Sequence, residues 1–240
     1  MPRPVLDFWF DFASTYSYLA AMRIGPLAQK ADVRVRFRPF LLGPIFKAQG
    51  WTTSPFNLYP AKGRHMWRDL ERSCAELQLP FRRPDPFPQN SLLAARVALA
   101  GLDQRWGEEF CRALFRAEFA DGRRIDDAAT VGDVLAALEV DPEPALVAAR
   151  SDAIKARLRA QTEEAQRLGL FGAPSFTTAD GELFWGNDRL EPALRCVGRK
   201  APPHAAKDRA AWAGRHGPCS AWPRRCCIRR SGRSRPPAPP

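Results

Sequence analysis

The sequence predicts an α/β protein in which the two ends of the chain build a sheet and the middle is helical. Near the N-terminus an apolar run, a helical run and an alternating run follow one another, which is the order of a β–α–β unit. Residues 62–168 show almost only the three-to-four spacing of amphipathic helices. Two short strand-like runs around a turn and a last helical run close this pattern.

The first strand is predicted over residues 5–12, an apolar run rich in phenylalanine. It ends in a turn of small residues, and a helix then begins at Ser17. A sharp turn from strand into helix leaves the first helical N–H groups without partners, so these groups and the helix dipole favour an anion there. Ser14 lies at this turn. It is either a simple helix N-cap, a position that serine often fills, or part of an anion-stabilising site.

The second strand is predicted over residues 33–42, where valines and a phenylalanine alternate with arginines. Pro26 is expected to kink the intervening helix or to restart it. Residues 43–62 are expected to be irregular, because prolines and glycines interrupt them. Within them, the aromatic residues of segment 51–57 form either a lid or pocket wall, or a loop packed on the core.

Between residues 62 and 168 the periodicity predicts a series of helices, of which the last is a long amphipathic helix over residues 151–168. A proline-rich stretch at residues 80–88 is expected to be extended. Strands are predicted again at residues 171–178 and 182–185, joined by a hairpin turn, before a last helix.

This order is that of a thioredoxin fold (βαβ–α–ββα) with an all-helical domain inserted between the second strand and the third helix–strand unit. We expect residues 1–42 and 152–197 to form the thioredoxin-like domain and residues 43–151 the insertion. Residues 198–240 hold 11 of the 37 lysines and arginines and eight of the 23 prolines, which predicts a disordered basic tail. We expect no specific nucleic-acid or membrane partner, because the other residues are nearly neutral and such a tail attracts either one through charge alone.

The sequence argues against several other classes of function. No apolar run is long enough to cross a membrane, and the N-terminus lacks the pattern of a signal peptide, so we expect a cytoplasmic protein with reduced cysteines. There is no P-loop and no glycine-rich dinucleotide turn. The histidines form no triad with a nucleophile and the cysteines lack zinc spacing, so no metal is expected.

The turn before the first helix is where a thioredoxin-like redox protein carries its Cys-x-x-Cys motif. Here both sulfur positions hold hydroxyls, those of Ser14 and Ser17. The turn keeps its anion-stabilising geometry but has no thiol of its own. A thiolate used there must come from another molecule, and glutathione is the obvious donor.

Pro174 begins the third strand of the predicted fold, where proline is tolerated only in a special role. If the Ala173–Pro174 bond is cis, the backbone of Ala173 is free to pair with a peptide such as glutathione; the alternative is a trans proline at an edge strand. Asp188 either accepts the α-amine of a γ-glutamyl group, with Asn187 beside its carboxylate, or only caps the last helix. Lys62 either faces a substrate carboxylate or belongs to a solvated basic face.

Five short motifs carry a resemblance to a known family: DFWFDFAS at 7–14, PAK at 60–62, FPQNS at 87–91, FGAP at 171–174 and WGNDRL at 185–190. Together they resemble the 2-hydroxychromene-2-carboxylate isomerases, which are similar to kappa-class glutathione transferases and to disulfide oxidoreductases with a helical insertion. The match runs from about residue 4 to residue 197. The sequence departs from the family at Thr15, usually proline, and at Trp51, asparagine in many members.

The resemblance implies glutathione as cofactor and Ser14 as the catalytic residue. It implies a cofactor site made of Ala173, Pro174, Trp185, Gly186, Asn187, Asp188, Phe56 and Asn57. Asn90 and Lys62 are the expected substrate-binding residues. It also implies a homodimer.

The expected reaction is a glutathione-dependent cis–trans isomerisation of the 2-hydroxychromene-2-carboxylate and trans-o-hydroxybenzylidenepyruvate type, by reversible addition of a thiolate to an aromatic pyruvate. The alternative within the same site is a glutathione transferase or peroxidase of kappa type. A disulfide oxidoreductase is disfavoured because residues 14 and 17 are not cysteines. A non-catalytic binding protein is the alternative from another class.

Overall fold

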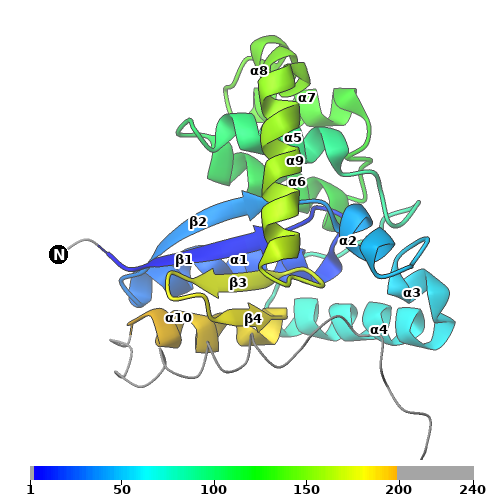
Figure 1. Cartoon of the computed structure of the whole chain (residues 1–240). Helices are drawn as coiled ribbons and strands as arrows, with labels where there is room; N and C mark the ends of the chain where they lie inside the picture. The colour runs from blue at the N-terminus through cyan, green and yellow to red at the C-terminus, as the bar shows by residue number, and fades with distance from the viewer. Residues whose placement is uncertain (1–2, 199–240) are drawn as a thin grey trace, which may run out of the picture. The chain divides into compact units, whose positions relative to one another are not determined.

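The computed structural model describes residues 3–198, and its centre is a mixed sheet of four strands (Figure 1). The strands are β1 (Val5–Phe10), β2 (Arg34–Pro39), β3 (Ser175–Thr178) and β4 (Leu183–Trp185). Their order is β2-β1-β3-β4, with β2 parallel to β1, β3 antiparallel to β1 and β4 antiparallel to β3. The predicted thioredoxin fold is therefore confirmed.

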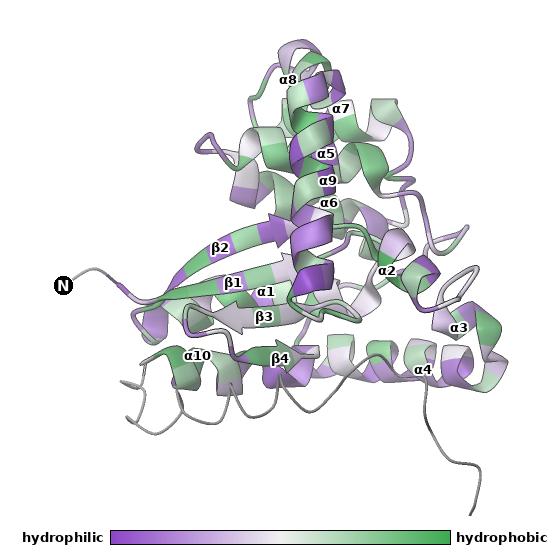
Figure 2. Cartoon of the chain, viewed as in Figure 1, coloured by the Kyte–Doolittle hydropathy of each residue, from purple (hydrophilic) through white to green (hydrophobic). Residues whose placement is uncertain are grey.

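The register of the sheet places aromatic side chains beside one another on neighbouring strands. Phe8 lies opposite Phe37 of β2 and Phe176 of β3. Its ring centroid lies 5.3 Å from that of Phe37 and 5.6 Å from that of Phe176. β2 alternates between hydrophilic and hydrophobic residues along its length (Figure 2), as its arginine pattern predicts. The centre of the sheet is thus an aromatic core, which fixes the strand that leads to the Ser14 turn.

Helix α1 (Thr15–Lys30) follows that turn and runs without interruption through Pro26. The predicted restart of the helix at Pro26 is therefore wrong. Proline removes one backbone hydrogen bond, but Ile24 and Ala28 on either side are buried against the core and hold the chain in helical form.

The central part of the chain is helical, as predicted. Its elements are α2 (Leu42–Ala48), α3 (Pro55–Leu58), α4 (Pro60–Glu76), α5 (Leu92–Gly101), α6 (Gly107–Phe119), α7 (Ala128–Ala137), α8 (Pro142–Arg150) and α9 (Asp152–Arg167). The irregular structure predicted for residues 43–62 is wrong in part, because α2, α3 and the start of α4 lie there. Pro55 and Pro60 are the first residues of their helices, where a missing N–H costs nothing. The predicted stretch 171–174 of the third strand is also not strand, since β3 begins at Ser175.

After β4, a short 3₁₀ helix, η1 (Asn187–Arg189), leads into the last helix α10 (Leu190–Gly198). The helices of the middle share one core with the sheet: Phe115 of α6 packs on Phe10 and Phe12, at centroid distances of 5.7 and 4.9 Å. Residues 3–198 belong to one compact unit by their contacts.

Two sequence-based predictions concern parts that the structure does not decide. The division into residues 1–42 with 152–197 and an insertion 43–151 stays a prediction. The disordered tail was predicted over residues 198–240, and residues 199–240 lie outside the described part. Within that described part, no helix combines the length and the apolar character needed to cross a bilayer.

Candidate active site

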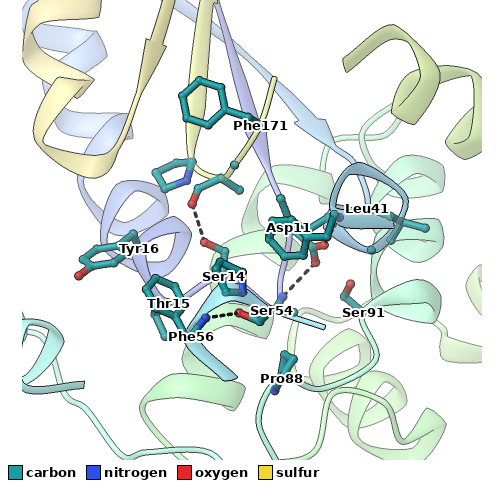
Figure 3. A pocket seen from close by; sticks show the side chains of 18 of the residues that line it. Asp11, Ser14, Thr15, Tyr16, Leu41, Ser54, Phe56, Pro88, Ser91 and Phe171 are labelled. Carbon is teal, nitrogen blue, oxygen red and sulfur yellow. Dashed lines mark hydrogen bonds between the residues drawn. The ribbon is translucent and has the colours of Figure 1, made fainter. Parts of the chain in front are cut away.

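A cavity of about 1220 Å³ opens at the carboxyl end of β1, around the turn that leads into α1. Its wall is built by the turn at residues 11–16, the segment 41–56, the segment 87–92 and the segments 171–174 and 185–189. These segments lie far apart in the sequence and meet because β1 and β3 are neighbours in the sheet. Figure 3 shows side chains that line it.

Ser14 lies in this cavity and makes two hydrogen bonds through its Oγ. The oxygen accepts a hydrogen bond from the N–H of Ser17 at 3.3 Å, so Ser14 is the N-cap of α1. The hydroxyl donates to the carbonyl oxygen of Ala173 at 2.9 Å (Figure 3). The cap is therefore real, and the same hydroxyl also faces the proline-led strand. Ser17 stands at the second cysteine position of the Cys-x-x-Cys motif. It is fully buried and does not line the cavity.

The Ala173–Pro174 bond is cis, as predicted. The carbonyl oxygen of Pro174 accepts a hydrogen bond from the N–H of Gly186 at 3.0 Å, which ties this segment to the start of η1. Two further cis bonds, Asp85–Pro86 and Phe87–Pro88, occur in the stretch that was predicted only to be extended. Phe87 and Pro88 line the cavity opposite the Ser14 turn.

Asp11 joins three of the segments that form the cavity. Its Oδ1 accepts a hydrogen bond from the N–H of Ala13 at 3.0 Å, and its Oδ2 accepts one from the N–H of Leu42, the first residue of α2, at 2.7 Å. The hydroxyl of Ser91, before α5, completes the set. Burial raises the pKa of Asp11, while these hydrogen bonds act in the opposite direction. The sequence pattern showed Asp11 only as an interruption of an apolar run.

Glu118 of α6 is a second carboxyl group in the same region of the interior. Its side chain is fully buried, and neither carboxyl oxygen has a hydrogen-bond partner among the residues that the structure describes. Burial raises its pKa well above the ordinary value, and the charges of Asp11 and Asp126 raise it further. Burial therefore favours the neutral form of the Glu118 carboxyl group.

Two glycines allow side chains to lie close to the backbone at the η1 side of the cavity. Gly186 has a φ of +112°, and a Cβ there would lie 2.5 Å from Oδ1 of Asp188. A Cβ on Gly172 would lie 2.5 Å from Nε1 of Trp185. Trp185 is half exposed at the rim and packs on Phe171, with a centroid distance of 4.8 Å. Asp188 and Trp185 therefore hold positions that only glycine neighbours permit.

The opposite side of the cavity is aromatic. The rings of Phe46 and Trp51 lie 5.6 Å apart, and Phe56 lines the same side. The ammonium group of Lys62 lies 4.8 Å from the centre of the Tyr59 ring. This segment is thus a pocket wall, which was one of the two alternatives predicted for it.

A polar pair closes the cavity beside α1. The hydroxyl of Tyr16 donates a hydrogen bond to Oδ2 of Asp69 on α4 at 2.8 Å, and both residues line the cavity. Sequence analysis did not select either one, because their contact joins residues on two helices that no spacing relates. No group of His, Cys, Asp and Glu side chains within residues 3–198 is arranged to hold a metal ion.

The structure brings nearly all the predicted site residues to this one cavity. Asn57 is the exception: it does not line the cavity, and its side-chain amide donates to the hydroxyl of Thr53 at 3.2 Å. The residues that do line it are Ser14, Phe56, Lys62, Asn90, Ala173, Pro174, Trp185, Gly186, Asn187 and Asp188. Their chemical roles stay predictions.

Comparison with known proteins agrees with this geometry. Residues 5–195 match the DSBA-like thioredoxin domain family. The chain belongs to this family. The matched residues span all four strands of the sheet and the helices from α1 to α9.

Two curated relatives and one solved structure place the chain within the family. A 2-hydroxychromene-2-carboxylate isomerase of Sphingobium xenophagum is 30% identical over 188 residues, which are 78% of this chain and 94% of the relative. Glutathione S-transferase kappa 2 of Caenorhabditis elegans is 28% identical over 78% of this chain and 89% of its own. A solved 2-hydroxychromene-2-carboxylate isomerase superposes with a TM-score of 0.74 and 27% identity, over 81% of this chain and 95% of that one. The prediction that the chain is an enzyme related to these isomerases is confirmed.

Proposed function

We propose that this protein is a glutathione-dependent isomerase of the type for which its relatives are named, acting on 2-hydroxychromene-2-carboxylate or a similar aromatic pyruvate. The proposal rests above all on one observation. The hydroxyl of Ser14 lies at the N-terminus of α1 beside the carbonyl of Ala173, and none of the cysteines within residues 3–198 lines the cavity. The chain therefore offers a thiolate site without a thiol.

The residues around Ser14 fit glutathione. The backbone of Ala173 lies beside the hydroxyl, where an extended peptide can pair with it. Asp188, whose side chain is largely exposed, is available to the ligand's α-amine. Asn187 and the N–H groups at the start of η1 suit the α-carboxylate of the ligand.

When bound, glutathione supplies a thiolate that adds reversibly to the conjugated double bond and so permits rotation about it. The Ser14 hydroxyl would then turn its one proton from the carbonyl of Ala173 to the sulfur, and the N-terminus of α1 adds a partial positive charge. Both effects stabilise the thiolate and lower the thiol pKa from ~8.5 toward neutrality.

The size of the cavity supports a second, apolar ligand beside the tripeptide. Its volume of about 1220 Å³ exceeds the ~300–1,000 Å³ of common ligand pockets. Phe46, Trp51 and Phe56 give the part away from η1 an aromatic surface suited to a flat substrate. Lys62 on the same side is suited to the substrate carboxylate.

The test compares Ser14→Ala with Ser151→Ala. Both serines are N-caps that accept a hydrogen bond at 3.3 Å, but Ser151 lies on α9 and does not line the cavity. We expect Ser14→Ala to reduce glutathione-dependent isomerisation about 100-fold and to raise the pKa of bound glutathione, followed by thiolate absorbance. Ser151→Ala should cost about 1 kcal/mol of stability and leave turnover intact. Full turnover by Ser14→Ala, or wild-type turnover that does not need glutathione, would refute the proposal.

The alternative is a kappa-type glutathione transferase, which the relative from Caenorhabditis elegans favours. The two functions share the site and differ in the product. An isomerase returns free glutathione, whereas a transferase consumes it and releases a thioether. Product analysis with an activated aryl halide and with the aromatic pyruvate separates them.

A further inference from the structure

Arg23 reaches from α1 to the η1 turn and contacts both this turn and the start of α10. Its Nη1 donates to the side-chain oxygen of Asn187 at 2.9 Å and to the backbone oxygen of the same residue at 3.5 Å. Its Nη2 forms an ion pair with Glu191 in the first turn of α10. One guanidinium group therefore spans the beginning of η1 and the beginning of the helix that follows.

Arg23 does this from outside the cavity. Its side chain is mostly buried, with 20% exposed, and it does not line the wall, whereas Asn187, Asp188 and Arg189 do. The other attachment of this turn is the hydrogen bond from the N–H of Gly186 to Pro174. The turn is thus held on one side by the proline-led segment and on the other by Arg23.

The hydrogen bond to Asn187 also fixes which way its side-chain amide points. An asparagine side chain has one oxygen that accepts and one NH₂ group that donates. Because the oxygen accepts from Arg23, the NH₂ group is the part left for a ligand. A donor suits a carboxylate, and the neighbouring carboxylate of Asp188 suits an amine. The turn therefore presents one group for each end of an α-amino acid.

We propose that Arg23 is the positioning residue that makes this turn specific for the γ-glutamyl end of glutathione. The inference rests on the proposed function, which assigns that end of the ligand to Asn187 and Asp188. Arg23 lies on the helix that Ser14 caps, nine residues further on, so a single helix sets the spacing between the sulfur end and the γ-glutamyl end of the ligand.

The experiment measures binding of two thiols by calorimetry: glutathione, and cysteinylglycine, which lacks the γ-glutamyl group. We expect Arg23→Met to weaken glutathione binding about tenfold and to leave cysteinylglycine binding unchanged. In steady-state assays the loss should appear in KM for glutathione rather than in kcat. Arg23→Lys should bind glutathione with an affinity between those of the wild type and Arg23→Met. An ammonium group keeps the charge toward Glu191 but lacks the two-pronged guanidinium group that also reaches Asn187.

Arg112→Met is the matched control. Arg112 has a similarly buried side chain, 25% exposed, pairs with Glu108 and Glu109, and lies outside the cavity wall. It should change the affinity for neither thiol. Equal weakening of both thiols by Arg23→Met, or no weakening of either, would overturn the inference while leaving the proposed function standing. A wild-type protein that binds no glutathione would overturn both.

Discussion

The two sides of the cavity are built in different ways. The polar wall consists of residues 11–14, 172–174 and 186–188. Ser14 and Gly186 donate hydrogen bonds to the 173–174 segment, and Asp11 accepts one from the N–H of Leu42. The aromatic wall, residues 46–56, is held by the contact between Phe46 and Trp51 and by bonds within its own stretch, such as Trp51 N–H to the carbonyl of Phe46 at 2.9 Å. The polar wall is therefore held by contacts between segments that are distant in the sequence, whereas the aromatic wall belongs to one connecting segment.

Under the proposed function, this difference assigns the two walls to different ligands. Activation of a thiol needs donors held in fixed positions, which the polar wall supplies. The shape offered to a substrate depends on the aromatic wall, which lies in connecting segments that tolerate change. Trp51 belongs to the aromatic wall. Likeness to the relatives is therefore a better guide to the cofactor than to the substrate.

The largest expected effect comes from Asp11→Ala, because Asp11 ties the Ser14 turn to the first residue of α2. The substitution leaves the N–H groups of Ala13 and Leu42 without their partner. We expect a loss of about 2–4 kcal/mol in the free energy of unfolding, measured with urea, and a loss of most of the isomerase activity. Asp127→Ala is the control, since Asp127 caps α7 away from the cavity with a bond to Ala129 at 3.2 Å. Asp127→Ala should lower the free energy of unfolding by about 1 kcal/mol and leave the activity unchanged. Equal effects of Asp127→Ala and Asp11→Ala would contradict the contrast between the walls.

Glu118→Gln tests the raised pKa of the buried carboxyl group near the polar wall. The pKa of Glu118 is raised in the folded protein, so unfolding at higher pH releases a proton. Wild-type stability should therefore fall as pH rises from the ordinary carboxyl pKa toward the raised one, by up to about 1.4 kcal/mol per pH unit. Glutamine cannot ionise, so the variant should lack this slope and exceed the wild type increasingly in that window. Urea unfolding over a pH series measures it. Wild-type and variant curves that run parallel across this pH range would contradict the assignment.

Trp51→Ala tests the aromatic wall alone. Removal of the indole takes away the partner of Phe46 and part of the apolar surface. We expect kcat/KM for the aromatic substrate to fall about tenfold while the affinity for glutathione stays within twofold. Steady-state kinetics and calorimetry give the two numbers. A larger change in glutathione affinity than in substrate kinetics would show that the two walls do not divide the ligands as described.

Gly172→Ala is the smallest change and tests the polar wall. The new methyl group would displace the Trp185 indole, a half-exposed side chain that can move, so stability should change by less than about 1 kcal/mol. Glutathione affinity should fall about threefold, because the proposed glutathione site includes Trp185. Gly132→Ala on α7, where the nearest atom would be at 3.7 Å, should leave affinity unchanged. Unaltered affinity in both variants would remove Trp185 from the site.

The fold could be predicted from the sequence because its elements follow local rules. Alternation along β2 and helical spacing along α9 each show in a single stretch of residues. The errors arose where a local rule has two meanings. Pro55 and Pro60 were interpreted as breakers, although proline also begins helices. Pro26 was expected to kink or restart its helix, and the restart does not occur because buried neighbours keep the helix continuous.

The candidate site could be predicted in part for the same reason. Ser14 and Pro174 lie in short motifs with a recognisable structural place, and both lie in the cavity. Asp11 and Arg23 were not selected, because their partners lie 31 and 164 residues away along the chain. Pairing of that kind is decided by tertiary packing, and no spacing in the sequence announces it.

Ser14 uses one oxygen for two tasks, since the atom that closes the first turn of α1 also carries the proton given to Ala173. The residues that close a helix well are Ser, Asn, Asp and, somewhat less well, Thr. Of these, aspartate would repel an anion, and asparagine has no hydroxyl. Saturation mutagenesis of this codon, followed by selection for both thermal tolerance and turnover, should therefore return serine first and threonine second.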